Sequence, residues 1–112
     1  MVVDDRADFR AVARILLEGE GFDVVGEAAD GMEAVRVAAR VTPDIVLLDV
    51  QLPDLDGFEV SRRLAGLTSP PVVVLTSSRP ISDLRRRVAA SPVAGFLPKD
   101  ALSGAALLTL VG

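Results

Sequence analysis

The sequence predicts a three-layer α/β fold, in which helices cover both faces of a doubly wound, five-stranded parallel sheet. Three observations support this prediction. Short apolar runs alternate along the chain with segments whose apolar residues recur at helical spacing. The run "DIVLLD" is apolar on consecutive residues, which is typical of a strand covered on both faces. The 112 residues, half of them hydrophobic, can supply one core, so residues 1–112 are expected to form one domain.

The first half of the chain predicts two strands and two helices. A strand at residues 2–3 stops at the acid pair Asp4–Asp5, and the helix that follows it ends at "EGEG". Residues 22–28 predict the second strand. Asp30, followed three residues later by a glutamate, predicts a capping box that opens a helix reaching about Arg40.

The middle of the chain predicts a strand, a loop and a helix. The strand covers residues 44–49 and follows Pro43, which separates it from the preceding helix. A polar loop occupies residues 50–57, where Pro53 and the pair Asp56–Gly57 are expected to shape the turn and cap the next helix. Three apolar residues lie on one side of that helix: Val60, Leu64 and Leu67.

The last third of the chain predicts two more strands, each followed by a helix. The strands are residues 72–76 and 93–98. The helix between them begins at Pro80, and three of its apolar residues are expected to face inward: Ile81, Leu84 and Val88. The run Arg85–Arg87 is expected to be mainly a solvated face, with partner docking as the alternative. Residues 103–111 predict the last helix.

Composition and charge argue against several classes of function. Sixteen acidic and twelve basic side chains give a net charge of −4, which argues against nucleic-acid binding by this domain. The chain has no cysteine for disulfides or thiolate metal sites, and no histidine for imidazole ligands or catalytic triads. It has no apolar run of the ~18 residues that a membrane span needs, and its start does not read as a signal peptide. We therefore expect a cytoplasmic protein.

Polar side chains lie at or just after the ends of four of the five predicted strands. Asp4 and Asp5 come directly after the first strand and Lys99 after the fifth, while Asp49 ends the third strand and Thr76 the fourth. In a parallel sheet the carboxyl ends of neighbouring strands converge, and the order 2-1-3-4-5 places the first strand beside the third. Three carboxylates at one place repel each other unless a cation lies among them. This pattern predicts a metal-assisted phosphoryl-acceptor site.

These residues closely resemble the receiver domain of bacterial two-component response regulators. The matching pieces are the acid pair Asp4–Asp5, "LLDVQLPDLDG" around Asp49, "VLTS" around Thr76 and "FLPK" ending in Lys99. Their order and spacing make the resemblance specific, and it covers essentially the whole chain. It implies a flavodoxin-like receiver fold with strand order 2-1-3-4-5, acting as a phosphorylation-activated signalling switch.

The resemblance implies a role for each residue around the acceptor. Asp49 accepts a phosphoryl group from the phosphohistidine of a histidine kinase. Mg²⁺ is held directly by Asp5, Asp49 and the backbone carbonyl of Gln51, while Asp4 holds a metal-bound water. Lys99 pairs with a phosphoryl oxygen as a point charge.

The resemblance also implies a relay away from the acceptor. The hydroxyl of Thr76 bonds a phosphoryl oxygen when the site is occupied, and Phe96, three residues before Lys99, is the aromatic residue that turns inward on activation. Phosphorylation is therefore expected to move Thr76 and Phe96 together. Gln51 and Ser78 are expected to flank the path of the water that hydrolyses the phosphoryl group.

Three features of the chain concern its two ends or depart from the usual pattern of the family. Only three residues precede the acid pair, so either residues are missing from this chain or its central strand is unusually short. Asp100 follows Lys99, where the family frequently has proline. The closing "LSGAALLTLVG" resembles the tail of short single-domain regulators, which favours a stand-alone regulator over the receiver of a longer protein.

The last helix predicts a protein–protein surface. Residues 101–112 contain no charged side chain, which is unusual for a helix that is exposed on one side. Two apolar stripes run along it, and a sheet covers only one: Leu107, Leu108 and Val111 form the first, and Ala106 with Leu110 the second. We expect the uncovered stripe to bind a second copy or an output partner, so that replacing Leu110 with glutamate weakens that binding without unfolding the domain. The alternative is that the tail folds over its own domain or frays.

Each candidate residue also has a purely structural interpretation, and other functions compete. Asp4–Asp5 fits a helix-capping pair, Thr76 a strand-end hydroxyl, Phe96 a core aromatic and Lys99 a solvated charge. A pseudo-receiver that only binds proteins is disfavoured, because every acceptor-site residue is present. A flavin or nucleotide binder needs a glycine-rich phosphate loop where this chain has "DDRADFR". A hydrolase commonly has a second carboxylate where this chain has Gln51, so no turnover is expected beyond slow loss of its own phosphoryl group.

Overall fold

Five parallel strands form the central sheet of the computed structural model, which describes residues 1–112. Their order is β2-β1-β3-β4-β5, which confirms the predicted doubly wound topology. The strands are β1 (Val2–Val3), β2 (Glu27–Ala28), β3 (Ile45–Asp49), β4 (Val72–Ser77) and β5 (Gly95–Pro98). All neighbouring pairs are parallel, so the carboxyl ends of β1, β3, β4 and β5 lie at one edge.

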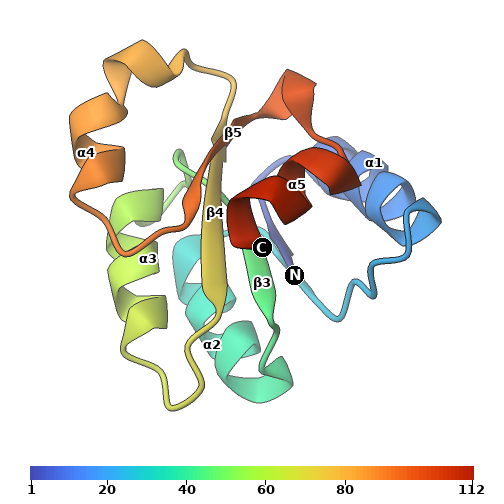
Figure 1. Cartoon of the computed structure of the whole chain (residues 1–112). Coiled ribbons are helices and arrows are strands. Elements are labelled where there is room, and N and C mark those ends of the chain that lie inside the picture. Colours follow the sequence, from blue (N-terminus) through green and yellow to red (C-terminus); the bar gives the residue numbers. More distant parts are fainter.

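Helices cover the two faces of the sheet and bury a separate hydrophobic core on each (Figure 1). One face carries α1 (Ala7–Gly19) and α5 (Gly104–Val111), and the other carries α2 (Gly31–Val41), α3 (Gly57–Ala65) and α4 (Arg85–Ala89). In β3, Leu47 belongs to the α1–α5 core, whereas Val46 and Leu48 belong to the other. Consecutive apolar residues of this strand therefore pack into both cores. Each such buried side chain stabilises the fold by roughly 1.5–3 kcal/mol.

Two predicted helix caps are present. The carboxylate of Asp30 accepts the backbone N–H of Glu33 at 2.8 Å, and that of Asp56 accepts the N–H of Glu59 at the same distance. The side chain of Glu33 reaches back to the N–H of Ala29, one residue before the usual partner in a capping box. No helix is long and apolar enough to cross a membrane.

The second strand is shorter than predicted. Residues 22–28 were expected to be extended in the ladder, but only Glu27–Ala28 pair, opposite the two residues of β1. A strand forms only where a neighbouring strand supplies backbone hydrogen-bonding partners, and β1 has only two residues to pair with. Val24 is nevertheless buried and packs in the α1–α5 core.

The helix predicted from Pro80 is broken. A 3₁₀ turn at Ile81–Asp83 comes first, and α4 follows after Leu84, whose φ of −121° and ψ of −3° interrupt the helical geometry. This break changes which side chains face inward. Leu84 is buried and Val88 is half-buried as expected, but Ile81 is 37% exposed and the prediction for it is wrong.

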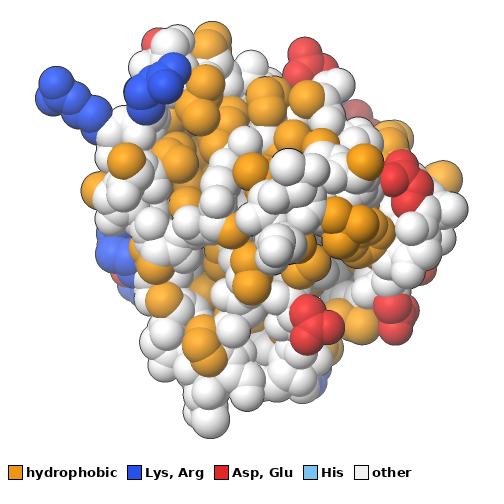
Figure 2. All heavy atoms as spheres, in the orientation of Figure 1, with side chains coloured by type: hydrophobic (Ala, Val, Ile, Leu, Met, Phe, Trp, Pro, Cys, Tyr) orange, Lys and Arg blue, Asp and Glu red, His pale blue; other side chains and the backbone are white.

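The last helix exposes a different residue from the one expected. Leu107 is buried, and Leu110 is half-buried against β5. The contact is close, because a Cβ atom added to Gly95 would lie 2.8 Å from Cδ2 of Leu110. Leu108 is the exposed leucine, at 54%. Figure 2 shows apolar side chains over the centre of this face, where α5 lies, with charged side chains at its margins. The uncovered surface of α5 is thus centred on Leu108, and the expectation that it includes Leu110 is wrong.

Candidate functional site

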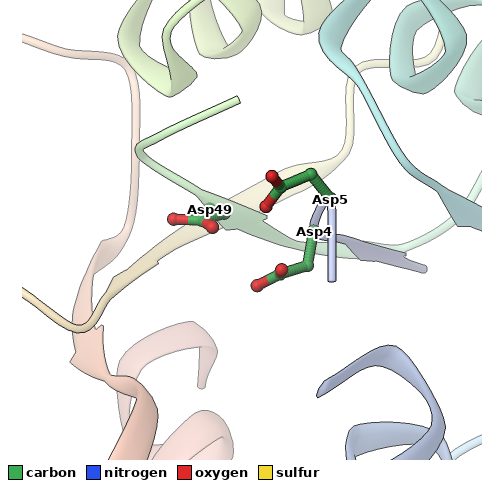
Figure 3. Close-up of side chains that lie close together, drawn as sticks. All are labelled: Asp4, Asp5 and Asp49. Carbon is green, nitrogen blue, oxygen red and sulfur yellow. The ribbon is translucent and has the colours of Figure 1, made fainter. Parts of the chain in front are cut away.

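Three carboxylates meet at the carboxyl edge of the sheet, as the strand ends predict. Carboxylate oxygens of Asp4, Asp5 and Asp49 all lie within 4.8 Å of one another (Figure 3). Asp4 and Asp5 follow β1, while Asp49 is the last residue of the adjacent β3. Asp4 is completely buried and Asp49 is nearly so, whereas Asp5 is exposed.

Asp49 is held by one backbone group and one ammonium group. Its Oδ1 accepts the N–H of Gln51 at 3.1 Å, and its Oδ2 accepts a hydrogen bond from Lys99 Nζ at 3.1 Å. Burial raises the pKa of the Asp49 carboxyl, the two hydrogen bonds oppose that shift, and the charge of Asp4 adds to it. Burial is thus the larger cause of the raised pKa, and repulsion by Asp4 the smaller one.

The two oxygens of Asp4 have different surroundings. Oδ1 accepts the backbone N–H of Arg6 at 2.9 Å. Arg6 is the N-cap residue of α1, and that helix begins without a side-chain cap, so the capping interpretation of Asp4 is wrong. Oδ2 lies 2.6 Å from Lys99 Nζ. That contact is an ion pair without hydrogen-bond alignment, and Oδ2 is a buried oxygen with no hydrogen-bond donor.

Lys99 lies between two carboxylates rather than in solvent. Burial opposes its charge, but its contacts with Asp4 and Asp49 raise the pKa of the ammonium above its usual value. The ammonium also lies 4.8 Å from the centre of the Phe9 ring. One positive charge among three acids leaves the cluster negative, and such a cluster suits a further cation.

Thr76 and Phe96 occupy neighbouring strands behind the cluster. Thr76 pairs with Asp49 in the β3–β4 ladder; it is completely buried and its Oγ1 has no hydrogen-bond partner. Phe96 pairs with Leu75 in the β4–β5 ladder and is half-buried against the α2–α4 core. The structure therefore places the Thr76 hydroxyl near the site without a partner and leaves the Phe96 ring partly accessible.

A shallow cleft of about 290 Å³ opens beside the carboxylates. Its wall includes Asp5, Asp49, Gln51 and Lys99, as expected from the sequence, and also the predicted neighbour Ser78. Arg6 lines it too, although sequence reasoning missed it; its guanidinium is hydrogen-bonded to Asp8. The sequence signal was a cation directly after the acid pair.

The loop after Asp49 is folded tightly against its own strand. The N–H of Gly57 donates to the carbonyl of Val50 at 2.7 Å, and a Cβ atom on Gly57 would lie 2.5 Å from the carbonyl oxygen of Asp49. No side chain fits in that space, so the glycine that the sequence placed in the loop is required by close backbone approach. This closure directs Gln51 toward the cleft.

Comparison with known families gives a match over almost the entire chain. Residues 1–111 match the family model described as "Response regulator receiver domain". The transcription regulator BvgA of Bordetella pertussis is 38% identical over 99 residues, which are 88% of this chain and 47% of that protein. A putative transcriptional regulator of Pseudomonas aeruginosa is 40% identical over 100 residues, 88% of this chain and 48% of that protein. The chain spans about half the length of these curated relatives.

Solved structures give the same result. The signal receiver domain of the putative response regulator NarL from Mycobacterium tuberculosis superposes with a TM-score of 0.87 and 32% identity, covering 99% of this chain and 94% of that one. A chain of the CheX–CheY–BeF₃–Mg²⁺ complex from Borrelia burgdorferi gives a TM-score of 0.83 and 28% identity, covering 98% and 83%. With the topology and the carboxylate cluster already in agreement, the chain belongs to the receiver domains of two-component response regulators.

Proposed function

We propose that residues 1–112 are one receiver domain that acts as a phosphorylation-activated switch, with Asp49 as the acceptor. The observation that carries this proposal is the setting of Asp49. It is a nearly buried carboxylate that faces the cleft, between a lysine ammonium and two further acids. The donor is the phosphohistidine of a histidine kinase, in keeping with the family, and the setting is the cytoplasm.

The transfer forms one bond and breaks one. A carboxylate oxygen of Asp49 attacks phosphorus, an O–P bond forms, and the N–P bond of phosphohistidine breaks with its electron pair left on the imidazole nitrogen. Lys99 is charged at neutral pH, because its ordinary pKa of 10.5 is raised further by the two carboxylates, and it pairs with a phosphoryl oxygen. No turnover follows beyond slow loss of the domain's own phosphoryl group.

Magnesium is proposed to bind at Asp5, Asp49 and the backbone carbonyl of Gln51, with Asp4 holding a water. Two observations support this fit. The acids gather carboxylate oxygens within 4.8 Å of one another, and the single ammonium of Lys99 leaves the three-acid cluster with a negative charge. When bound, the ion neutralises charge on the transferring phosphoryl group. The similar Borrelia burgdorferi complex includes Mg²⁺.

The relay is proposed to run through Thr76, Phe96 and Lys99 to a partner-binding face that includes α5. The buried Oγ1 of Thr76 has no partner, so a phosphoryl oxygen gives it one, and the displaced hydroxyl leaves room for the half-buried Phe96 ring. Thr76→Ala is expected to accept the phosphoryl group but to show little change in the NMR signals of Phe96. An undiminished change would contradict the coupling.

The central test is intact-mass analysis after incubation with acetyl phosphate and Mg²⁺. Wild type is expected to gain one phosphoryl group, and Asp49→Asn, which keeps the size and hydrogen bonding of the side chain, none. Labelling that persists in Asp49→Asn would mean that another residue is the acceptor. An unlabelled wild type that still binds a partner would favour the second candidate, a pseudo-receiver that binds proteins without phosphorylation.

A further inference from the structure

We propose that Asp54 is a positioning residue, which ties the β3–α3 loop to the first turn of α2 and so fixes the Gln51 wall of the cleft. The proposal rests on the proposed function for its consequence, metal and phosphoryl binding. It rests on hydrogen bonds and packing for its geometry. Asp54 lies five residues after the acceptor and does not itself line the cleft.

Asp54 makes two hydrogen bonds across more than twenty residues of sequence. Its Oδ1 accepts the backbone N–H of Gly31 at 2.7 Å, and its Oδ2 accepts the N–H of Met32 at 2.9 Å. Oδ1 also accepts the N–H of Leu55 at 2.8 Å, which fixes the orientation of the carboxylate within its own loop. From Gln51 to Asp56, the only other hydrogen bond to a distant element is the one that Asp56 accepts from Arg87.

The first turn of α2 needs this carboxylate. Four backbone N–H groups open a helix without partners inside it. In α2, the side chain of Asp30 accepts from Glu33, and the first regular helical bond runs from Ala34 to the Asp30 carbonyl. Asp54 accepts from the two N–H groups between them, those of Gly31 and Met32, and these groups lower the pKa of its carboxyl, so the ionised form is the one that binds.

Gly31 shows that this joint is closely packed. A Cβ atom added there would lie 2.7 Å from Val60 Cγ2, 3.0 Å from Leu55 Cβ and 3.2 Å from Asp54 Oδ1. The start of α2 therefore approaches both the loop and α3 at a distance that only glycine permits. This packing is independent of the hydrogen bonds and locates the joint at the same place.

The tie has a consequence for the cleft, because only four residues separate Asp54 from Asp49. Three of these, Gln51, Leu52 and Pro53, line the cleft, and the Gln51 carbonyl is the proposed backbone ligand. Residues that orient a metal ligand typically change metal affinity or activity by about 10–100-fold when they are removed. Without Asp54, the loop retains its sequence but loses its anchor to α2.

The test compares Asp54→Ala with Asp30→Ala. Both substitutions remove a carboxylate that caps α2, but only Asp54 joins that helix to the loop. We expect Asp54→Ala to speed hydrogen exchange at residues 51–56 and to weaken Mg²⁺ binding, measured by titration, about tenfold. We expect Asp30→Ala to leave both within about twofold of wild type while lowering stability. Asp54→Asn, which keeps one acceptor oxygen, should recover part of the loss and serves if the alanine variant does not fold.

Each outcome decides the proposal. Unchanged loop exchange in Asp54→Ala, or equal losses in Asp54→Ala and Asp30→Ala, would overturn it. A wild type that binds no Mg²⁺ and accepts no phosphoryl group would overturn the proposed function instead. In that case the exchange of residues 51–56 alone would still decide whether Asp54 anchors the loop.

Discussion

The two sides of the acidic site are built differently. On one side, β3 leads into α3, a nine-residue helix that is capped by Asp56 and has five buried residues. On the other side, β4 leads through a 3₁₀ turn into α4, which has five residues, no side-chain cap and no buried residue. Segments with few buried contacts open at the lowest free-energy cost. The acceptor thus lies on the firmly packed side, and we expect the response to phosphorylation on the side of α4 and Phe96.

The largest effect is expected where the packed side is tightest. Gly57→Ala places a Cβ atom 2.5 Å from the Asp49 carbonyl oxygen and 2.8 Å from Val50 Cα, and both are backbone atoms, which cannot rotate away as a side chain can. We expect a loss of about 3 kcal/mol in the free energy of unfolding, measured with urea.

Gly66→Ala, at the other end of α3, is the matched control. The nearest atom to its new Cβ would be the Arg63 carbonyl oxygen at 3.5 Å, and its φ of −86° suits alanine. Its stability is expected to stay within about 0.5 kcal/mol of wild type or to rise slightly. Equal effects of the two substitutions would contradict the close approach at Gly57.

A smaller effect, of opposite sign, is expected at the acceptor itself. An unfolded aspartate loses its proton near the ordinary pKa of 3.8, whereas burial keeps the folded Asp49 protonated to higher pH. Between the pKa of the unfolded chain and the raised pKa of folded Asp49, the unfolded chain binds fewer protons than the folded one. The free energy of unfolding of wild type therefore falls as pH rises from the first pKa to the second, and it is not regained at higher pH. Asp49→Asn lacks this loss and should be more stable at neutral pH by on the order of 1 kcal/mol.

Thermal melts across pH check this prediction. The difference between Asp49→Asn and wild type should shrink as pH falls toward 3.8 and disappear well below it, where Asp49 is protonated in both the folded and the unfolded state. Added Mg²⁺ should narrow the difference at neutral pH, because an ion that binds only the folded wild type stabilises it. A wild type that is more stable than Asp49→Asn at neutral pH without metal would contradict the expected sign.

Arg87 connects the two sides of the site, because it lies in α4 and contacts residues at the start of α3. Its Nη2 lies 2.7 Å from Asp56 Oδ2, and its guanidinium carbon is 4.1 Å from the centre of the Phe58 ring. All three arginines of the run are exposed, as the expected solvated face requires, but only Arg87 makes an ion pair. We expect Arg87→Ala to cost about 1 kcal/mol, with faster hydrogen exchange in α4.

Arg86→Ala is the matched control, with an expected change below about 0.3 kcal/mol. High salt should reduce the effect of Arg87→Ala only in part, since the stacking on Phe58 depends less on ionic strength than the exposed ion pair does. If both variants unfold alike, α4 is not held by this contact.

The smallest effect on stability is expected at Leu108. Leu108→Glu changes an exposed side chain of α5 and should alter the free energy of unfolding by less than about 0.5 kcal/mol, yet weaken self-association or partner binding. Leu110→Glu should instead destabilise the domain, since Leu110 packs against Gly95. Light scattering before and after phosphorylation measures association. A monomer in both states, with no partner binding that depends on Leu108, would end this proposal.

The order of the elements, two helix caps and the members of the carboxylate cluster follow from the sequence. They depend on local properties: apolar periodicity, a capping carboxylate at the start of a helix, and the rule that parallel strands end at one edge of the sheet. These properties are encoded within a few residues of each position. For the same reason, the sequence alone predicts that Asp4, Asp49 and Lys99 lie at one place.

Other features depended on partners that are distant in sequence. Asp4 is buried and its neighbour Asp5 is exposed, because Lys99 and the start of α1 enclose only the first. The length of β2 is limited by the two residues of β1 with which it pairs. Which side of α5 is covered depends on the contact between Leu110 and Gly95. From the sequence, Asp54 is only an acidic residue in a loop. Its hydrogen bond to the N–H of Gly31, twenty-three residues away, forms only in the folded domain. Local periodicity contains no information about such contacts, since they form only when separate elements pack together.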